Sequence, residues 1–208
     1  MIIAVDGPAA SGKGTIAKAL AAHFALPWLD TGLLYRAVGI GVLRAGGDPD
    51  DANIALTACD FPDALLEDPT LRSEEAGAYA SRVSVHPAVR EALIERQKMF
   101  AAQPGGAVLD GRDIGTVIAP HADAKLFVMA SAEVRAERRF RDESSDNPDA
   151  NYDAILADIV ERDKRDSERA SAPLKRTEDA DLLDTSDLTI SAAVQRAIAL
   201  VEARTGKR

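Results

Sequence analysis

One glycine-rich stretch, at residues 7–15, constrains this chain more than any other feature of its sequence. It reads Gly7-Pro8-Ala9-Ala10-Ser11-Gly12-Lys13-Gly14-Thr15. A short apolar run at residues 2–5 precedes it. After it, Ile16, Leu20 and Phe24 recur every four residues, which is the spacing of one helix face. The sequence therefore predicts a buried strand, a glycine-rich turn and an amphipathic helix, which is the context of a phosphate-binding turn.

The residue types in this turn suit a polyphosphate. Glycines let backbone N–H groups converge on phosphate oxygens without Cβ clashes. A helix that begins near Lys13 adds the positive end of its dipole, and the lysine adds a mobile positive charge for the outer phosphates. We interpret residues 7–15 as a P-loop that binds a nucleoside triphosphate. The alternative is an ordinary strand-to-helix turn with a surface lysine.

The residue after the lysine departs from the general P-loop pattern. A Ser or Thr that touches Mg²⁺ normally stands there, but this chain has Gly14, and the hydroxyl comes one residue later, at Thr15. This variant resembles the nucleoside-monophosphate kinases. Thr15 is one candidate Mg²⁺ ligand. Asp110, which ends an apolar run, is another and would act through water, because Mg²⁺ keeps several of its waters. The alternative for Asp110 is a turn-forming Asp-Gly pair.

Apolar strand-like runs alternate with helical patterns along the whole chain. The strand candidates are residues 2–5, 28–29, 107–110, 125–129 and 182–183. Apolar residues at helical spacing stand between these runs, among them Leu34, Val38 and Val42, then Val89, Leu93 and Phe100, then Ile155 and Ile159, and finally Val194, Ile198 and Val201. This alternation favours a parallel sheet covered by helices. We expect an α/β fold, a three-layer sandwich of the P-loop kinase type with a five-stranded parallel sheet and helices on both faces.

The length of 208 residues fits one domain with insertions. We expect a single P-loop kinase domain over residues 1–208, with a small monophosphate-binding insert at about 48–87, the least regular region. Ser131 is a plausible N-cap for a basic helix. The polar loop at 144–151 then separates two arginine-bearing helices. We expect a lid at about 131–160, since closure would keep water from hydrolysing ATP.

The charge balance limits the partners of the chain. Asp and Glu number 34 against 25 Lys and Arg, which gives a net charge of −9. Nucleic-acid polymers and anionic membranes should repel such a chain, and a nucleic-acid-binding ATPase conflicts with it. No apolar run reaches the roughly 18 residues of a membrane helix. With Cys59 as the only cysteine, no intrachain disulfide can form. We expect a cytoplasmic monomer with no nucleic-acid or membrane partner.

Arginines recur in short signatures and indicate an anionic second substrate. They are Arg36 in the stretch 30–36, Arg90 after Pro87, Arg112 in Asp-Gly-Arg-Asp, and Arg162, Arg165 and Arg169 in the stretch 161–169. The stripe of Ile155 and Ile159 continues at helical spacing into Arg162, Asp166 and Arg169. This helix would then leave the core and line a cleft. The alternatives are solvated side chains and an Arg162–Asp166 surface pair worth about 0.3–0.5 kcal/mol.

Several motifs together resemble the bacterial cytidylate kinases. These are Gly-Lys-Gly-Thr at 12–15, Leu-Asp-Thr-Gly-Leu-Leu-Tyr-Arg at 29–36, Leu-Asp-Gly-Arg-Asp-Ile-Gly-Thr at 109–116, Glu-Arg-Asp-Lys-Arg-Asp at 161–166, Ala-Pro-Leu at 172–174 and Leu-Asp-Thr at 183–185. They cover most of the chain in the same order. The resemblance implies transfer of the γ-phosphoryl group of ATP, with Mg²⁺, to CMP or dCMP. Many longer members carry a larger β-rich insert, which here is shortened to about residues 60–72.

The resemblance also implies roles for single residues. It puts Asp30, Thr31 and Asp113 near the cytosine or the edge of the bound nucleotide. Arg36, Arg90 and Arg112 resemble ligands of the acceptor phosphate or base. Arg162 and Asp166 resemble sugar contacts, and Arg169 a contact to the transferred phosphate. Lys13, Arg162 and Arg169 are the expected catalytic residues.

The expected chemistry needs charge neutralisation more than a general base. The second pKa of a phosphate monoester is near 6, so the acceptor is already an anion at neutral pH. His23, His86 and His121 are therefore interpreted as structural or solvated. Cytosine N4 donates a hydrogen bond that a carboxylate such as Asp113 accepts, whereas uracil presents an acceptor there. Two alternatives stay open: a P-loop kinase for another small phosphate or hydroxyl acceptor, and a non-catalytic nucleotide-binding module.

Overall fold

The computed structural model describes residues 1–145 and 147–206 and divides the chain into two compact units. Unit 1 consists of Met1–Leu29 and the chain from Gln103 onward, and unit 2 is Asp30–Ala102. Asp146, in the loop expected to belong to a lid, lies outside the described residues. The expected insert at 48–87 falls within unit 2, and the expected lid at 131–160 falls within unit 1.

Unit 1 alternates strands and helices. Its strands are β1 (Ile2–Asp6), β2 (Trp28–Asp30, whose last residue begins unit 2), β3 (Ala107–Gly111), β4 (Ala124–Met129) and β5 (Asp181–Asp184). Its helices are α1 (Lys13–His23), the short π-helix η3 (Ile114–Ile118), α6 (Ala132–Ser144), α7 (Tyr152–Glu168) and α8 (Ile190–Thr205). All five strands predicted from apolar runs are present, within a residue or two at each end.

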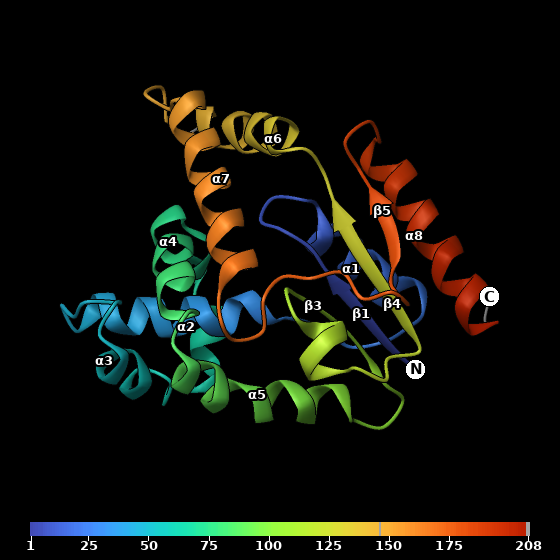
Figure 1. The fold of residues 1–208 in the computed structure, drawn as a ribbon, viewed down its shortest axis with the longest axis horizontal. Helices are drawn as coiled ribbons and strands as arrows, with labels where there is room; N and C mark the ends of the chain where they lie inside the picture. Colours follow the sequence, from blue (N-terminus) through green and yellow to red (C-terminus); the bar gives the residue numbers. More distant parts are fainter. Residues whose placement is uncertain (146, 207–208) are drawn as a thin grey trace. The chain divides into compact units, whose positions relative to one another are not determined.

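The strands form one sheet in the order β2-β3-β1-β4-β5, and Figure 1 labels β1, β3, β4 and β5. β1 pairs in parallel with β3 on one side and β4 on the other, and β4 pairs in parallel with β5. Ile3 stands opposite Val108 and Ala124. The predicted α/β fold with a five-stranded parallel sheet flanked by helices is confirmed.

Alternation along β1 assigns its side chains to the two faces of the sheet. Ile3 and Val5 point into a core that α1 and α8 complete, with Leu20, Leu126 and Val201 among its buried members. Ala4 and Asp6 point the other way, and there the Asp6 carboxylate meets the start of η3. β1 therefore places its last side chain against the segment that follows β3.

Helices α6 and α7 pack together through a small core of their own, formed by Ala136, Ile155 and Ile159. The predicted N-cap of α6 is confirmed, since Ser131 Oγ accepts the N–H of Val134 at 3.2 Å. Asn151 caps α7 by accepting the N–H of Ala154. The buried stripe of α7 runs from Ile155 through Ile159 to Asp166. The buried side of the helix is thus apolar in its first turns and polar toward its end, as the sequence predicts.

Unit 2 is helical. It contains α2 (Thr31–Arg44), α3 (Ala52–Thr57), the short 3₁₀ helices η1 (Asp63–Glu67) and η2 (Pro69–Arg72), α4 (Glu74–Val83) and α5 (Pro87–Ala101). The sequence showed little regularity at residues 48–87, yet α3 and α4 lie there. Local signals for α4 are present: Ser73 accepts the N–H of Ala76, and Glu74 and Glu75 favour the positive end of the helix dipole.

The core of unit 2 forms where α2 meets α4 and α5. The predicted stripe of Leu34, Val38 and Val42 is buried there. A Cβ on Gly39 would lie 2.8 Å from the Cβ of Tyr79, so α2 and α4 approach closely only because glycine stands at this position. This packing holds the first turns of α2, which carry predicted substrate residues, in a fixed orientation within the unit.

Candidate functional site

The phosphate-binding loop, residues 7–15, starts from a position that only glycine can occupy. Gly7 follows β1 directly, and a Cβ there would lie 2.0 Å from the carbonyl oxygen of Val128. The N–H of Gly7 donates to Gly111 O at 3.3 Å, which joins the start of the loop to the end of β3. The loop therefore lies at the carboxyl ends of β1, β3 and β4, the edge at which parallel α/β sheets bind ligands.

The loop then enters α1 through two residues in the left-handed region. Ala10 has φ 57° and Gly12 has φ 86°. Turns of this kind direct successive N–H groups into a concave, anion-binding surface. Gly12 is the N-cap of α1, and the first turn of α1 has neither a side-chain cap nor an acidic residue. Its amides are thus available to an anion. The predicted strand, turn and helix are confirmed.

Lys13 and Asp110 lie near the start of α1. Lys13 Nζ donates to Pro8 O at 3.3 Å, so the side chain folds back over the loop. Asp110 is the next-to-last residue of β3 and is buried. One carboxylate oxygen accepts Trp28 Nε1 at 2.7 Å, and the other lies 3.7 Å from where a Cβ on Gly14 would stand. Thr15 is exposed in the first turn of α1. One carboxylate and one hydroxyl therefore border the phosphate-binding loop.

A resident metal cage is absent from the part of the chain that the structure describes. No group of three or more His, Cys, Asp and Glu residues is arranged there to hold an ion. Mg²⁺ that arrives with a nucleotide needs no such cage, because phosphate oxygens and water fill most of its coordination positions. Asp110, which approaches Gly14, and Thr15 of the loop fit that mode of binding better than they fit a permanent metal centre.

Unit 1 brings five of the predicted acceptor residues together, and an ion pair between Arg112 and Asp166 joins two of them. Arg112 Nε donates to Asp166 Oδ2 at 2.8 Å, which links the segment after β3 to α7. Burial raises the pKa of Asp166, but the charges of Arg112, Arg162 and Arg169 outweigh it and hold the pKa below its usual range. Asp166 is therefore a buried, ionised carboxylate shared by three guanidinium groups.

A second pair joins the end of α7 to the same segment. Arg169 Nη2 lies 3.9 Å from Asp113 Oδ1, and both side chains are less than a tenth exposed. Arg169 Nε donates to Ala172 O at 2.7 Å, which fixes the guanidinium at the helix end. Arg165, by contrast, pairs with Glu161 on the surface of the helix. The charges of Arg162 and Arg169 thus act on Asp166, whereas Arg165 pairs with Glu161.

Unit 2 holds the other four predicted substrate residues, three of them at the start of α2. Asp30 is the N-cap of α2 and accepts the N–H of Gly32 at 2.9 Å, while Thr31 is buried. Arg36 Nη1 donates to Leu71 O and to Ser73 O, at 2.8 Å each. The solvated alternative for Arg36 is wrong. The shortened insert, residues 60–72, ends at the carbonyl groups that orient this guanidinium.

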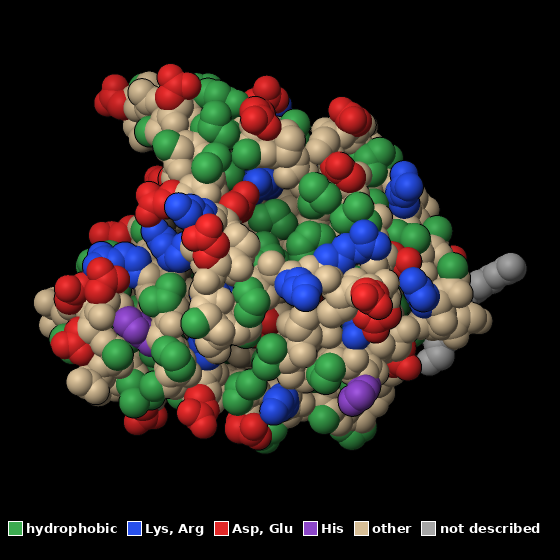
Figure 2. Space-filling view, viewed as in Figure 1, with side chains coloured by type: hydrophobic (Ala, Val, Ile, Leu, Met, Phe, Trp, Pro, Cys, Tyr) green, Lys and Arg blue, Asp and Glu red, His purple; other side chains and the backbone are tan. Residues whose placement is uncertain are grey.

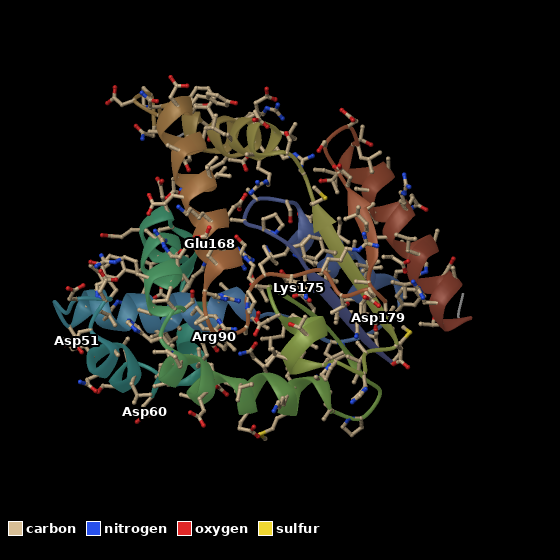
Figure 3. All side chains as sticks on the ribbon, in the orientation of Figure 1. Asp51, Asp60, Arg90, Glu168, Lys175 and Asp179 are labelled. Atoms are coloured by element: carbon tan, nitrogen blue, oxygen red, sulfur yellow. The ribbon has the colours of Figure 1, made fainter. Side chains whose placement is uncertain are left out.

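Arg90 lies on α5 (Figure 3). Its side chain is buried, and its guanidinium stands 5.4 Å from the centre of the Tyr35 ring, a cation–π arrangement. Arg90 Nη1 also reaches Ser84 O at 3.4 Å. The interpretation of Arg90 as an ordinary solvated helix arginine is therefore wrong as well.

Sequence reasoning missed a buried carboxylate at the end of β1. Asp6 Oδ1 accepts the N–H of Ile114 and Oδ2 accepts the N–H of Gly115, at 2.8 Å each. Burial raises the pKa of Asp6 to about 6, although these two N–H groups act in the opposite direction. Asp6 immediately precedes the phosphate-binding loop and holds the residues that follow Asp113. Its place at the end of an apolar run, directly before the glycines, was the available signal.

The structure also has a cavity beside the phosphate-binding loop that could not be located from sequence patterns. Its volume is about 530 Å³, and its lining includes Gly12, Thr15, Arg138, Thr185 and Ile190. Arg138 donates to the hydroxyl of Thr185 at 3.1 Å and to its carbonyl at 2.6 Å. The cavity thus combines backbone of the loop, a fixed guanidinium and apolar side chains from the start of α8.

The histidines lie outside these groups, as expected. His23 stands 3.5 Å from Glu202 and packs edge-on against Phe24. His86 Nε2 is 2.8 Å from Pro49 O, and His121 is exposed. On the face drawn in Figure 2, acidic and basic side chains are interspersed. Within the described residues, no helix combines the length and the apolar character needed to cross a bilayer.

Comparisons with known proteins agree with these features. A family model described as "Cytidylate kinase" matches residues 3–203. A cytidylate kinase of Xanthobacter autotrophicus is 57% identical over 208 residues, covering all of both chains, and one of Rhodopseudomonas palustris is 56% identical over 210 residues, covering 100% of this chain and 99% of that one. A solved gluconokinase from Sinorhizobium meliloti has a TM-score of 0.56 at 15% identity, covering 99% of this chain and 93% of that one, and is similar in fold alone.

Proposed function

The chain belongs to the cytidylate kinase family, and we propose that its phosphate-binding loop and two groups of arginines carry the family reaction. The reaction transfers the γ-phosphoryl group of ATP to CMP or dCMP and gives ADP with CDP or dCDP. The protein is thus an ATP-dependent nucleoside-monophosphate kinase. The roles of its single residues are the subject of the proposal.

The donor is held by unit 1 in this proposal. Residues 7–15 bind the phosphates of ATP through backbone N–H groups, and Lys13 leaves Pro8 O to reach the outer phosphates. The cavity lined by Arg138, Thr185 and Ile190 takes the nucleoside part of ATP. Its volume of about 530 Å³ is of the size expected for a small-molecule site. Its continuity with Gly12 and Thr15 of the loop supports this assignment.

Mg²⁺ enters with ATP. Asp110 would hold it through water, and Thr15 is the nearest hydroxyl of the loop. When bound, the ion neutralises charge on the donor phosphates and helps to orient them. The buried carboxylate of Asp110 suits this role because Trp28 fixes one of its oxygens and the other lies close to Gly14 of the loop.

The acceptor is bound by the arginines that the family motifs carry. Arg36, Arg90 and Arg112 bind the acceptor phosphate or base, and Arg162 with Asp166 binds the sugar. Asp30, Thr31 and Asp113 select the base, where the carboxylate of Asp113 accepts a hydrogen bond from cytosine N4. A site built around such a bond rejects uracil, which would leave the carboxylate facing another acceptor.

The transfer step needs no general base, since the acceptor oxygen is already anionic near neutral pH. The difficulty is the repulsion between two polyanions at contact distance. Each charge-assisted hydrogen bond contributes about 1.5–3 kcal/mol, so several guanidinium groups are enough to offset it. Lys13, Arg162 and Arg169 stabilise the charge of the loose transition state. Arginine suits this task because it stays charged and binds phosphate oxygens in bidentate fashion.

The accessory parts complete the proposal. The segment at about 48–87 is the monophosphate-binding insert, and α6, α7 and the polar loop at 144–151 act as a lid over about 131–160 that excludes water. The protein works as a cytoplasmic monomer. Sedimentation equilibrium with and without both nucleotides tests the monomer, and a concentration-dependent mass would contradict it.

One observation carries the proposal: the phosphate-binding loop and a cluster of three arginines around the buried Asp166 carboxylate occur in the same unit. The test incubates the protein with ATP, Mg²⁺ and CMP and follows ADP and CDP by anion-exchange chromatography. We expect equal amounts of both products, and we expect Lys13→Met to abolish them while the melting temperature stays near that of wild type. ADP without CDP, or full activity in Lys13→Met, would contradict the assignment.

A further inference from the structure

Arg135, on the first turn of α6, is a buried arginine that the mechanism above does not use. Its Nε donates to Ala130 O at 2.9 Å, and its Nη1 donates to Ala9 O of the phosphate-binding loop at 3.2 Å. Nη1 and Nη2 also form a two-pronged contact with the Asp163 carboxylate, at 3.0 and 2.5 Å. One guanidinium thus joins the end of β4, the phosphate-binding loop and α7, all within unit 1.

We propose that Arg135 and Asp163 form a positioning pair that holds the phosphate-binding loop and helix α7 in the one arrangement that supports phosphoryl transfer. The pair touches neither substrate. It acts through the loop on one side and through Arg162, Asp166 and Arg169 on the other. This inference rests on the proposed function of those residues.

The contact to Ala9 bears directly on the shape of the loop. In a planar trans peptide, the carbonyl of Ala9 and the N–H of Ala10 point in opposite directions. Arg135 therefore sets the direction of the Ala10 N–H when it fixes the Ala9 carbonyl. Ala10 is also one of three residues other than glycine with positive φ in the described part of the chain. A conformation that an L-residue avoids persists only where its surroundings enforce it, and Arg135 is such an enforcing contact.

The contact to Asp163 bears on the arginines of α7. Asp163 and Asp166 stand three residues apart on α7 and are therefore neighbours on its surface. The two hydrogen bonds from Arg135 to the Asp163 carboxylate fix the rotation of α7 about its axis. This rotation directs Asp166 toward Arg112 and presents Arg162 and Arg169 to the same carboxylate. Asp163 is also the residue next to Arg162, so a shift of α7 at this point would move a catalytic guanidinium directly.

A second arginine provides a natural comparison. Arg139, one turn further along α6, also bonds to α7, with Nη1 donating to Asp158 at 2.9 Å. It also bonds to Glu143 of its own helix. Asp158 is half exposed. The two pairs connect the same two helices, and the bonds of Arg135 also reach the phosphate-binding loop, at Ala9 O.

The test compares three conservative variants of the full chain in steady-state kinetics with ATP, Mg²⁺ and CMP. Arg135→Lys keeps the charge but cannot make the forked contact, and Asp163→Asn keeps the shape but loses the charge. Asp158→Asn breaks the control pair. For the first two, we expect kcat to fall by about 10- to 100-fold, because small displacements of reacting groups have effects of that size. We expect the KM for CMP to stay within about threefold. For Asp158→Asn, we expect kcat to stay within about twofold.

The outcomes separate this inference from the proposed function. A kcat within about twofold of wild type in Arg135→Lys and Asp163→Asn would overturn the inference, as would an equal loss in Asp158→Asn or a loss confined to KM. If Asp163→Asn does not melt cooperatively, Arg135→Lys decides alone, because lysine keeps the positive charge that faces the Asp163 carboxylate. A wild-type protein without activity on CMP would instead refute the proposed function.

Discussion

Replacement of Asp6 by Asn gives a sharp test of how the site is built. The carboxylate is buried and accepts the N–H groups of Ile114 and Gly115. The nearby charges are Asp113, which raises its pKa, and Arg112, which lowers it. An Asn side chain has the same shape but only one acceptor oxygen, and its NH₂ group does not titrate. The variant therefore removes the titration of this site. It also sets the NH₂ group against one of the two backbone N–H groups, and this cost does not vary with pH.

The structure sets the size and the sign of the effect. Burial raises the pKa of Asp6 from its ordinary value of 3.8 to about 6. This difference corresponds to about 3 kcal/mol, at about 1.4 kcal/mol for each pH unit. Because the folded pKa lies above the unfolded one, the folded state binds the proton more tightly. The contribution to stability is therefore complete below pH 3.8 and is lost as the pH rises through about 6.

The assay measures urea unfolding of wild type and Asp6→Asn at several pH values from about 4 to about 7.5. The other carboxyl groups titrate in both proteins, so the difference in unfolding free energy isolates Asp6. We expect wild type to lose about 2.4 kcal/mol relative to the variant across this range, since the remainder is lost below about pH 4. Asp123→Asn serves as control, because its exposed carboxylate accepts the N–H of Ile2 at the opposite end of β1. A difference that does not change with pH would refute the reasoning.

Three further predictions follow from the site. Asp113→Asn should lower the preference for CMP over UMP by about tenfold or more in a competition assay, and an unchanged ratio would remove Asp113 from base selection. Gly12→Ala and Gly46→Ala impose similar left-handed strain, at φ 86° and 65° and with open space for the new Cβ. Each substitution should cost about 1–2 kcal/mol of stability. Only Gly12→Ala should raise the KM for ATP, and equal KM values in the two variants would show that the loop tolerates the change. Amide exchange at 135–145 and 147–155 should slow when both nucleotides are bound, and exchange that stays fast would argue against a lid.

Patterns within one segment made the fold largely predictable. The apolar run before Gly7 and the four-residue repeat after Lys13 predicted β1 and α1 because strand and helix periods depend on near neighbours. The alternation of such segments then indicated a parallel sheet. Residues 48–87 gave no comparable period, and helix α4 was missed although Ser73 and the two following glutamates mark its start. Small and polar residues dominate its sequence, so its burial depends on close approach to α2, which local spacing does not record.

The site was predictable where motifs carry the chemistry. The Arg-rich end of α7 was expected to be polar along its buried side, and Asp166 is indeed buried. Its partner Arg112 lies 54 residues away, and no sequence pattern indicated that pairing. The contacts of Asp6 to Ile114 and of Arg135 to Ala9 span 108 and 126 residues. These bonds exist only because the sheet brings distant strand ends together. Positioning residues of this kind therefore emerge from the fold and not from the motifs.

The most direct measurement of the central claim is the initial rate of phosphoryl transfer from ATP to a panel of acceptors, namely CMP, dCMP, UMP, AMP and a non-nucleotide acceptor such as shikimate. The account predicts rapid formation of CDP or dCDP together with ADP, and much slower transfer to the other acceptors. Tight nucleotide binding without turnover, or a faster rate with AMP, UMP or shikimate than with either cytidine nucleotide, would contradict it.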